Sequence, residues 1–488
     1  MDLLIGDVFR NAARAVPDRM AAALGPQALT FAQLDRRANQ MARALGRAGA
    51  PDLARVGVWS TTDLGLVPIF AALAKSGRVF GPLNPALSAG EATRALALFD
   101  PVLLLVDGGR AAPGGEIARH LGIPVISLEE LGVLADAEDE TDIGCLVLRE
   151  NDPHVVFFTS GTTGGPKGVV LSHRVSFLRT HPGALLEPRG VMVCPYPLFH
   201  MGAWTIALQQ WQTRDCVVFV PSADAASVCE AVDRFAASRL NCIPAVWRRI
   251  LGYLETPAGR RHDLSSLRFA DTGTSATPPE LLLAIEAALP DARLRVFYGS
   301  TEAGSVAALE QADIRRKPGS CGPPAPSAEV RIDGDGEVWI RGPLLFDEYF
   351  GDAEATAEAL VDGWYRTGDR AEVDDDGYLT IVGRIGDTIR TGGETVAPVE
   401  VEAALAECPA VADVAVVGVP DVQWGEVVCA VIVPAANTTT PTLEELRAHC
   451  SSRLAAFKHP RRVVVLDAIP RSSATGQIQR RLLVELLT

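Results

Sequence analysis

The chain of 488 residues lacks several features that would assign it to particular protein classes. Its nine cysteines form no CxxC pair and show no metal-ligand spacing, which argues against a disulfide framework or a zinc site and favours reduced thiols in a cytoplasm. The longest apolar run, Leu64 to Ala74, contains Pro68 and is too short to span a bilayer. The first residues include Asp2, Asp7 and Arg10 in place of a basic start and an apolar stretch. No export signal or transmembrane segment is therefore predicted.

Positive charge is scarce relative to negative charge. The chain has 45 Lys and Arg against 60 Asp and Glu, a formal net charge of -15. Its Arg-rich pieces, such as Arg315 to Lys317 and Arg480 to Arg481, are short. Nucleic acids and anionic membrane surfaces are therefore not predicted as partners.

The length and patterning predict a mixed α/β protein with a large domain followed by a smaller one. Thr30 with Gln33, and Ser88 with Glu91, are capping boxes that each predict the start of a helix. Short apolar runs between the helical segments predict strands of substantially parallel sheets. These runs are Val56 to Trp59, Val102 to Val106, Val155 to Phe158, Val217 to Val220 and Leu294 to Phe297.

The pattern changes to antiparallel signals after about residue 330. The turn residues Asp333 to Gly336 and Asp374 to Gly377 each precede a strand pattern, which predicts a small β-rich subdomain. Beyond Arg384, strands alternate with helices from Pro398 and Thr442. This pattern predicts a compact C-terminal α+β domain of about 100 residues. The predicted domains are residues 1–384 and 385–488.

A loop dense in glycine and hydroxyl residues follows the strand Val155 to Phe158. The segment Thr159 to Val169 reads TSGTTGGPKGV, and its glycines would let backbone NH groups approach phosphate oxygens closely. The alternative is a flexible surface loop, which rarely combines these residue types so densely. The loop is not a Walker P-loop, because Pro166 precedes Lys167 and Gly168 follows it.

This loop resembles the signature of the adenylate-forming superfamily of acyl-CoA synthetases, amino-acid adenylation domains and luciferases, and further motifs follow in that family's order. The resemblance, most like an acyl-CoA synthetase, implies a ligase. In such enzymes a carboxylate attacks the α-phosphate of Mg-ATP, giving acyl-AMP and pyrophosphate, and a thiol, commonly coenzyme A, then displaces AMP. The resemblance also implies that the protein binds ATP, Mg²⁺ and coenzyme A. The phosphate contacts it implies are Thr159, Ser160, Gly161, Thr162, Thr163, Gly164 and Lys167, with Thr162 also beside the metal.

Two further motifs resemble the adenine side of the family's site. In YGSTEAG, from Tyr298 to Gly304, the resemblance implies that Glu302 holds Mg²⁺, a role that suits a carboxylate. Taken alone, this Glu would more often be a helix N-terminal charge. The segment GTSAT, Gly273 to Thr277, aligns loosely with an adenine and acyl motif. The nucleotide contacts implied here are Tyr298, Gly299, Ser300, Thr301, Glu302, Ser275 and Ala276, and the acyl contacts are Gly273 and Thr274.

The ribose and the domain pivot are implied by two later motifs. In WYRTGD, Asp369 would accept hydrogen bonds from both ribose hydroxyls, although an Asp after Gly368 could also be a plain turn residue. Arg384 matches a second ribose and phosphate contact. Two residues on, where the family usually has Asp or Lys, Gly386 stands at the pivot of C-terminal domain rotation. Glycine allows the rotation but has no side chain to hold either orientation.

The thiol and acyl sites are implied by the remaining motifs. The segment Thr391 to Glu402 matches a loop that forms the thiol channel, with Arg390, Gly392, Gly393 and Glu394 as its contacts; a β-turn before a helix explains it equally well. His200 in PYPLFH matches a gate beside the acyl site, although a lone His is more often structural. The predicted acyl pocket also contains Met201, Gly202, Trp204 and Trp247. These carry no basic group for a second carboxylate, which favours a hydrophobic monoacid, and core packing explains several of them equally well.

The last motif, PRSSATGQIQRRLL, departs from the family at one position. Gln477 stands where the resemblance implies the lysine that neutralises charge during adenylation. Three explanations remain open: an engineered replacement, a naturally impaired or specialised enzyme, or rescue by another cation such as Lys458, Arg480 or Arg481. We expect impaired adenylation but intact thiol transfer. The alternatives are an enzyme that loads a carrier-protein thiol and a non-catalytic nucleotide or acyl-CoA binder.

Overall fold

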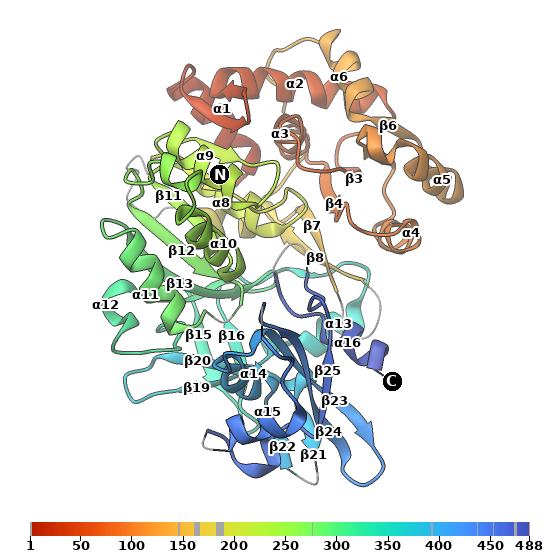
Figure 1. Cartoon of the computed structure of the whole chain (residues 1–488). Coiled ribbons are helices and arrows are strands. Elements are labelled where there is room, and N and C mark those ends of the chain that lie inside the picture. Colours follow the sequence, from red (N-terminus) through yellow and green to blue (C-terminus); the bar gives the residue numbers. More distant parts are fainter. Residues whose placement is uncertain are drawn as a thin grey trace.

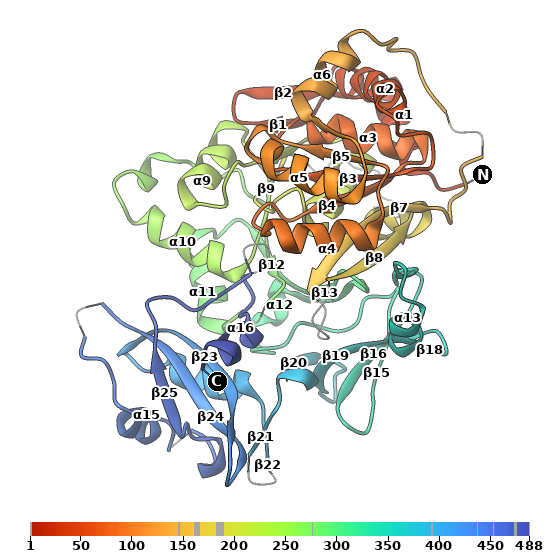
Figure 2. The ribbon, with the colours of Figure 1, turned by 90° about the vertical axis from the view of Figure 1, so that its right-hand side faces the viewer.

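The computed structural model describes residues 2–144, 147–160, 166–181, 190–275, 277–391, 394–436, 438–451, 453–472 and 476–487. Within these residues the chain forms two large sheets with helices, a smaller antiparallel sheet, and a C-terminal sheet with its own helices. Figures 1 and 2 show the C-terminal part in blue, below the larger N-terminal part. The predicted mixed α/β class, with a β-rich subdomain and a small C-terminal α+β domain, is confirmed.

The first large sheet is mainly parallel. Its strand order is β14-β13-β12-β11-β9-β10-β1-β2, and only the two outermost pairings, β13 with β14 and β1 with β2, are antiparallel. The strands are β1 (Met20–Leu24), β2 (Gln27–Thr30), β9 (Met192–Cys194), β10 (Val217–Phe219), β11 (Arg239–Cys242), β12 (Phe269–Gly273), β13 (Arg293–Ser300) and β14 (Gly304–Glu310). The C-terminal ends of β12 and β13 carry the GTSAT and YGSTEAG segments, where ligands of parallel sheets commonly bind.

The second large sheet is parallel at one side and antiparallel at the other. Its order is β17-β8-β7-β4-β3-β5-β6, with antiparallel pairing of β7, β8 and β17. The strands are β3 (Arg55–Trp59), β4 (Val79–Leu83), β5 (Leu103–Val106), β6 (Val125–Ser127), β7 (Pro153–Ser160), β8 (Pro166–Ser172) and β17 (Glu348–Tyr349). The glycine-rich loop therefore joins two strands of one hairpin, unlike the strand-to-helix connection of a P-loop.

Two smaller sheets follow along the chain. The antiparallel sheet contains β15 (Glu329–Ile332), β16 (Glu337–Arg341), β18 (Leu360–Val361), β19 (Trp364–Val373) and β20 (Leu379–Arg384). The C-terminal sheet contains β21 (Ile389–Thr391), β22 (Glu394–Val396), β23 (Val411–Asp421), β24 (Gly425–Pro434) and β25 (Arg462–Val465). Buried residues of the C-terminal sheet form cores of their own, from Ile389 to Leu483.

The helices begin at the capping residues expected from the sequence. Thr30, Ser88 and Thr442 each accept a backbone N–H bond within a capping box. The α-helices are α1 (Ile5–Ala15), α2 (Phe31–Arg47), α3 (Leu66–Ser76), α4 (Ala89–Phe99), α5 (Ala111–Leu121), α6 (Leu128–Asp136), α7 (His173–Thr180), α8 (Met201–Gln212), α9 (Ala225–Arg234), α10 (Pro244–Leu254), α11 (Pro279–Ala288), α12 (Gln311–Ile314), α13 (Ala353–Ala359), α14 (Pro398–Ala406), α15 (Leu443–Cys450) and α16 (Arg480–Leu487). Among the described residues, no helix has both the length and the apolar character needed to cross a membrane.

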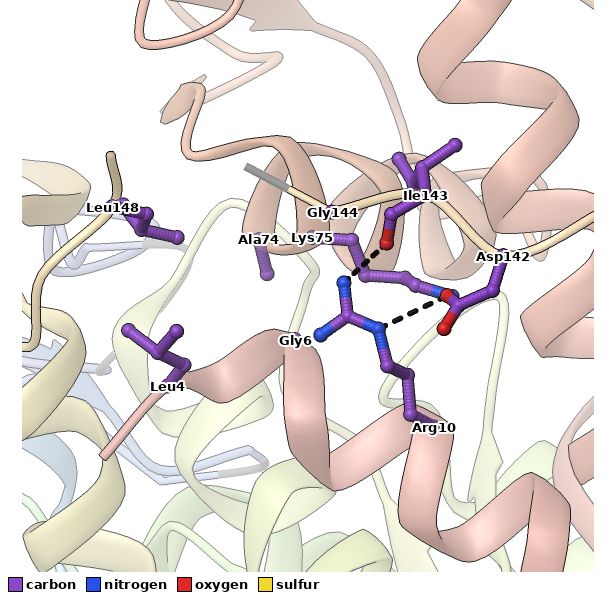
Figure 3. Close-up of a pocket in the computed structure, with 9 residues that line it drawn as sticks. All are labelled: Leu4, Gly6, Arg10, Ala74, Lys75, Asp142, Ile143, Gly144 and Leu148. Carbon is purple, nitrogen blue, oxygen red and sulfur yellow. Dashed lines mark hydrogen bonds and ion pairs between the residues drawn. The ribbon is translucent and has the colours of Figure 1, made fainter. Parts of the chain in front are cut away.

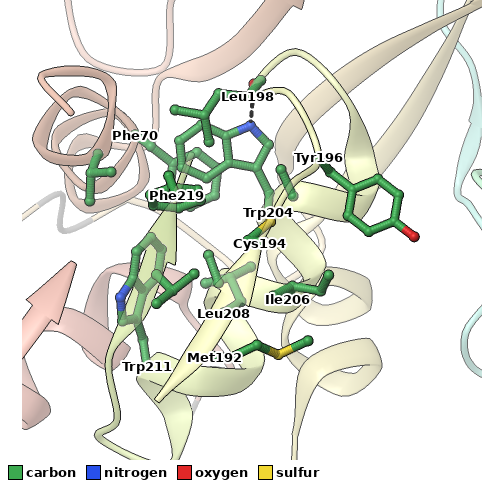
Figure 4. Packing of buried hydrophobic residues seen from close by; sticks show 14 of the residues in the cluster. Phe70, Met192, Cys194, Tyr196, Leu198, Trp204, Ile206, Leu208, Trp211 and Phe219 are labelled. Atoms are coloured by element: carbon green, nitrogen blue, oxygen red, sulfur yellow. Dashed lines mark hydrogen bonds between the residues drawn. The ribbon is translucent and has the colours of Figure 1, made fainter. Parts of the chain in front are cut away.

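The apolar run Leu64 to Ala74 forms most of α3, every residue of which is buried. Its Phe70 stacks on Trp204 of α8, with ring centroids 4.1 Å apart, and the Trp204 indole N–H donates to the carbonyl of Leu198 at 2.7 Å (Figure 4). The core that contains these rings includes strands of both large sheets. Burying large aromatic side chains contributes strongly to such a core, so the two sheets and their helices form one N-terminal unit.

Lys75 of α3 is completely buried beside a cavity of about 280 Å³ (Figure 3). Its ammonium lies 2.8 Å from Asp35, 2.9 Å from Asp142 and 2.5 Å from the side-chain oxygen of Asn39. Arg10 also bonds Asp142, at 3.0 Å. Because the buried charge is paired and hydrogen-bonded, this cluster ties the segment after α6 to the helices.

Candidate active site

The phosphate side of the predicted site is described only at its two flanks. Thr159 and Lys167 are paired across β7 and β8, so the loop between them leaves from adjacent strands. The Lys167 ammonium lies 4.6 Å from the ring centroid of Tyr349 on β17, within cation–π range. The predicted contacts Gly161, Thr162, Thr163 and Gly164 lie outside the described residues, and Ser160 ends β7.

Tyr298, Asp369 and Arg384 come together from three strands. The Tyr298 hydroxyl donates to Asp369 Oδ2 at 2.8 Å, and Arg384 Nε donates to Asp369 Oδ1 at 2.7 Å. Asp369 and Arg384 are direct partners in the β19–β20 pairing, so the sheet register sets their distance. The negative charge of Asp369 raises the pKa of Arg384. Burial is the larger cause of the raised pKa of Tyr298, and the charge of Asp369 is the next cause. Each carboxylate oxygen has a second lone pair, so ribose hydroxyls can bond Asp369 without displacing these partners.

Glu302 lies in the turn between β13 and β14. Its Oε1 accepts from the Tyr349 hydroxyl at 3.2 Å, and its backbone carbonyl accepts from Arg179 Nη2 at 2.7 Å. Burial, then Glu302, raises the pKa of Tyr349, so its phenol stays protonated as the donor near neutral pH. The sequence reasoning missed Tyr349 and Arg179, because both lie outside the quoted motifs and no local pattern distinguishes them from packing residues.

The Glu302 carboxylate suits Mg²⁺, because Mg²⁺ in nucleotide sites usually takes one or two carboxylates together with substrate phosphate oxygens. Within the described residues, Glu302 Oε2 has no hydrogen-bond donor, so one oxygen remains for a hard cation. The same part of the chain contains no cluster of three or more His, Cys, Asp or Glu side chains that could hold a metal. This donor set fits a metal that arrives with the nucleotide.

His200 caps the start of α8 on the predicted acyl side. Its Nδ1 accepts from the backbone N–H of Gly202 at 3.1 Å, and its ring stacks on Tyr196, whose hydroxyl donates to Asn241 at 2.8 Å. Burial lowers the pKa of His200 to about 4, so the imidazole is neutral near pH 7. With Nδ1 already occupied, a role as gate fits this geometry better than a role as proton acceptor. The sequence reasoning missed Asn241.

The other predicted acyl residues have different surroundings. Trp204 lies in the core described above, and Trp247, also fully buried, donates its indole N–H to the carbonyl of Asp271 at 2.9 Å. Met201 accepts from the Thr205 hydroxyl at its sulfur. A Cβ at Gly273 would lie 2.4 Å from the carbonyl oxygen of Phe297, so only glycine fits there. Packing accounts for both tryptophans, and their contact with an acyl group stays a prediction.

The C-terminal part reaches this side of the site through Gln477. Its side-chain amide donates to the carbonyl of Thr274 at 3.0 Å, across the two parts of the chain. A Cβ at Gly476 would lie 2.9 Å from Ile243 Cδ1, so this loop approaches the N-terminal unit closely. Thr274 and Gly476 both have φ of +67°. The structure thus brings position 477 to the predicted acyl residues; Ser275 follows Thr274, and Ala276 lies outside the described residues.

The three cations considered as substitutes for a lysine at 477 are each paired elsewhere. Arg480 donates to both oxygens of Glu402, at 2.6 and 2.8 Å. Arg481 pairs with Glu485 on its own helix at 3.0 Å, and Lys458 pairs with Glu400. The Arg480 pair is bidentate and shielded from solvent, so moving Arg480 to Thr274 would break a strong contact. The pairs of Arg481 and Lys458 are more exposed and oppose such a movement only weakly.

Comparisons with known proteins identify the family. The model of the AMP-binding enzyme family matches residues 9–350, and that of the AMP-binding enzyme C-terminal domain matches residues 400–476. The chain belongs to this adenylate-forming family. It is 31% identical to the long-chain-fatty-acid–CoA ligase FadD13 of Mycobacterium tuberculosis, covering 99% of this chain and 98% of that protein. It is 33% identical to the indoleacetate–CoA ligase of Aromatoleum aromaticum, covering 95% and 94%.

A solved relative agrees over the whole chain. The crystal structure of ATP-bound MatB from Rhodopseudomonas palustris matches with a TM-score of 0.88 and 25% identity, covering 100% of this chain and 99% of that one. The two curated relatives are named as CoA ligases, and the chain here matches both the N-terminal and the C-terminal family models.

Two of the four predicted thiol-channel residues lie on the C-terminal sheet of this AMP-binding enzyme. Arg390 and Glu394 belong to the β21–β22 hairpin, and the Arg390 backbone N–H donates to Glu426 at 2.7 Å. Gly392 and Gly393 lie outside the described residues. Gly386 lies in the 3-10 turn Ile385–Asp387 that joins the two units.

Proposed function

We propose that the protein is an ATP-dependent acyl-CoA ligase that acts on a hydrophobic carboxylic acid. In the first step a carboxylate oxygen bonds to the α-phosphorus of ATP and pyrophosphate leaves. In the second step the sulfur of coenzyme A bonds to the acyl carbon and AMP leaves. The observation that carries the proposal is the convergence of Asp369 and Arg384 on Tyr298, which lies on β13 just before the Glu302 turn. Gln477 reaches the loop after β12 at Thr274.

Each part of the nucleotide has a candidate partner. Tyr298 stacks on adenine and Asp369 accepts from the ribose, which its spare lone pairs permit. Arg384 contacts the ribose and phosphate, and Lys167 at the base of the glycine-rich loop contacts the departing phosphates. Glu302, with Thr162, would hold Mg²⁺, which when bound neutralises negative charge on the phosphate oxygens.

The acid is proposed to be a hydrophobic monoacid. The acyl-side residues Met201, Gly202 and Trp247 carry no positive charge, and His200 is neutral near pH 7 because burial lowers its pKa. A second carboxylate would need a cation to offset the cost of its burial. The acids in the names of the two relatives, a long-chain fatty acid and indoleacetate, each have one carboxylate and a large apolar part.

The two half-reactions are proposed to use two orientations of the C-terminal domain, residues 385–488, which turns about Gly386. The hydrogen bond from the Gln477 amide to the Thr274 carbonyl supports this proposal, because it brings position 477 to the acyl side, which is the orientation we assign to adenylation. The second orientation would bring Arg390, Gly392, Gly393 and Glu394 to the site as the thiol channel. Gln477 donates a hydrogen bond but has no charge, so the adenylation step is proposed to be impaired.

The test is a panel of acids with ATP, Mg²⁺ and coenzyme A, run on the protein and on Gln477→Lys. Mass spectrometry of the products identifies any acyl-CoA and the preferred acid. A carrier protein with a phosphopantetheine arm, tested in place of coenzyme A, shows whether that thiol is preferred. If neither form makes a thioester or AMP from any acid, the proposal is wrong and a non-catalytic binder is favoured.

A further inference from the structure

Arg179 near the end of α7 joins two loops of the metal side of the site. Its guanidinium donates to three backbone carbonyls: Nη1 to Thr301 at 2.8 Å, Nη2 to Glu302 at 2.7 Å, and Nε to Leu344 at 2.8 Å. The first two acceptors lie in the turn that presents the Glu302 carboxylate. The planar fork of arginine can bond three fixed acceptors at once, which a lysine ammonium cannot reproduce.

The third acceptor begins a segment that returns to the phosphate side. After Leu344, the backbone N–H of Phe346 donates to the Glu302 carbonyl at 2.7 Å. The segment then forms β17, in which Tyr349 pairs with Val169 of β8. Tyr349 bonds the Glu302 carboxylate and its ring lies under Lys167. The guanidinium thus holds the Glu302 turn together with Leu344, where the segment that leads to Tyr349 and Lys167 begins.

The guanidinium is closely surrounded. Burial lowers the pKa of Arg179 to about 10, while Glu302 and Asp347 act in the opposite direction. It therefore remains charged near pH 7. Gly304, with φ of +70°, passes so close that a Cβ there would lie 3.1 Å from Arg179 Nε. This fit leaves the fork little freedom to move.

We propose that Arg179 is a positioning residue that holds Glu302 where Mg²⁺ on the nucleotide phosphates can reach it. The inference rests on the proposed function, because it takes Glu302 as the metal ligand. It concerns binding of the metal–phosphate part of ATP and not of the adenosine part, which Tyr298 and Asp369 hold by contacts of their own.

The experiment measures binding by calorimetry for Mg·ATP and for metal-free AMP. Outer partners that orient a metal ligand typically contribute ten- to hundredfold in metal affinity. We expect Arg179→Lys to raise the Kd of Mg·ATP by about tenfold or more and to leave the Kd of AMP unchanged. Arg174→Lys is the matched control, since Arg174 is on the same helix but pairs at the surface with Glu150.

A second variant and a double variant keep the test decisive. Gly304→Ala would place a Cβ 3.1 Å from Arg179 Nε and strain the backbone of the same turn, so it should change the same constant in the same direction. In a Glu302→Gln background, Arg179→Lys should add little, because its effect acts through that carboxylate. Unchanged Mg·ATP binding in Arg179→Lys, or equal weakening of Mg·ATP and AMP, would overturn the inference alone. Failure of the unaltered protein to bind either nucleotide would refute the proposed function as well.

Discussion

Replacing Gln477 with lysine should restore the adenylation step. The Gln477 amide lies 3.0 Å from the Thr274 carbonyl, so a side chain of similar length at this position already reaches the acyl side. Lysine would add a positive charge there without a new backbone conformation. Removing one preorganised electrostatic contact to a developing oxyanion costs about 2.7 to 4 kcal/mol, or about a hundred- to thousandfold in rate. We therefore expect a gain of that size in acid-dependent ATP–pyrophosphate exchange.

The assay has a control built from the same substitution two residues away. Gln479→Lys introduces an equal charge at an exposed position of the same segment. It should leave exchange at the level of the unaltered protein, whereas Gln477→Lys should raise it. If the unaltered protein already exchanges as fast as Gln477→Lys, another cation performs the role, and the argument from the paired Arg480, Arg481 and Lys458 is refuted. If only the lysine variant exchanges, either an engineered or a natural loss of the lysine remains consistent.

Three further predictions follow from particular contacts. Asp369→Asn should raise the Kd of AMP by about tenfold or more, because hydrogen bonds to a charged group contribute about 1.5 to 3 kcal/mol. Tyr298→Phe, which removes a hydrogen bond to Asp369, should raise that Kd less. Equal AMP binding by calorimetry in the unaltered protein and both variants would contradict the ribose assignment. Burial lowers the pKa of His173 to about 4, below that of an unfolded histidine. As pH falls, the unfolded chain therefore takes up the proton first. The free energy of unfolding should then decrease as pH falls from about 6.5 toward 4. His173→Asn, which keeps an acceptor for the Ile5 N–H, should flatten that dependence in urea denaturation at pH 7 and pH 5; an equal slope would refute this origin. Gly386→Pro restricts the proposed pivot and should slow thioester formation from acyl-AMP by about tenfold or more, with AMP binding unchanged. An unaltered transfer rate would exclude the pivot.

The sequence predicted those parts of the fold that local patterns determine. The capping boxes at Thr30 and Ser88 start α2 and α4, because their side-chain bonds involve residues three positions apart. The run Leu64 to Ala74, too short for a membrane span, forms most of a buried helix. The strand order of the two large sheets could not be predicted, since it depends on pairings between residues far apart in the chain.

The residues of the candidate site also divide into those that sequence motifs identify and those that only the folded chain brings together. Motif order pointed to Asp369 and Arg384, and their pairing across β19 and β20 is a long-range consequence of register. Arg179 and Tyr349 could not be found from the sequence, because their roles depend on carbonyls and a carboxylate brought near by the fold. A tryptophan that packs in a core cannot be distinguished in the sequence from one that lines a ligand pocket. The sequence alone therefore could not separate these two roles for Trp204, which is buried.

Thioester formation from a preformed acyl-adenylate tests the central claim most directly, because this half-reaction needs the site and coenzyme A but not the charge missing at position 477. The unaltered protein is mixed with coenzyme A and acyl-AMP made from the acid that the Gln477→Lys panel identifies, and acyl-CoA and AMP are followed by mass spectrometry. The account predicts that acyl-CoA and AMP form together, at a rate similar to that of Gln477→Lys. An acyl-adenylate that persists with both proteins would contradict the account.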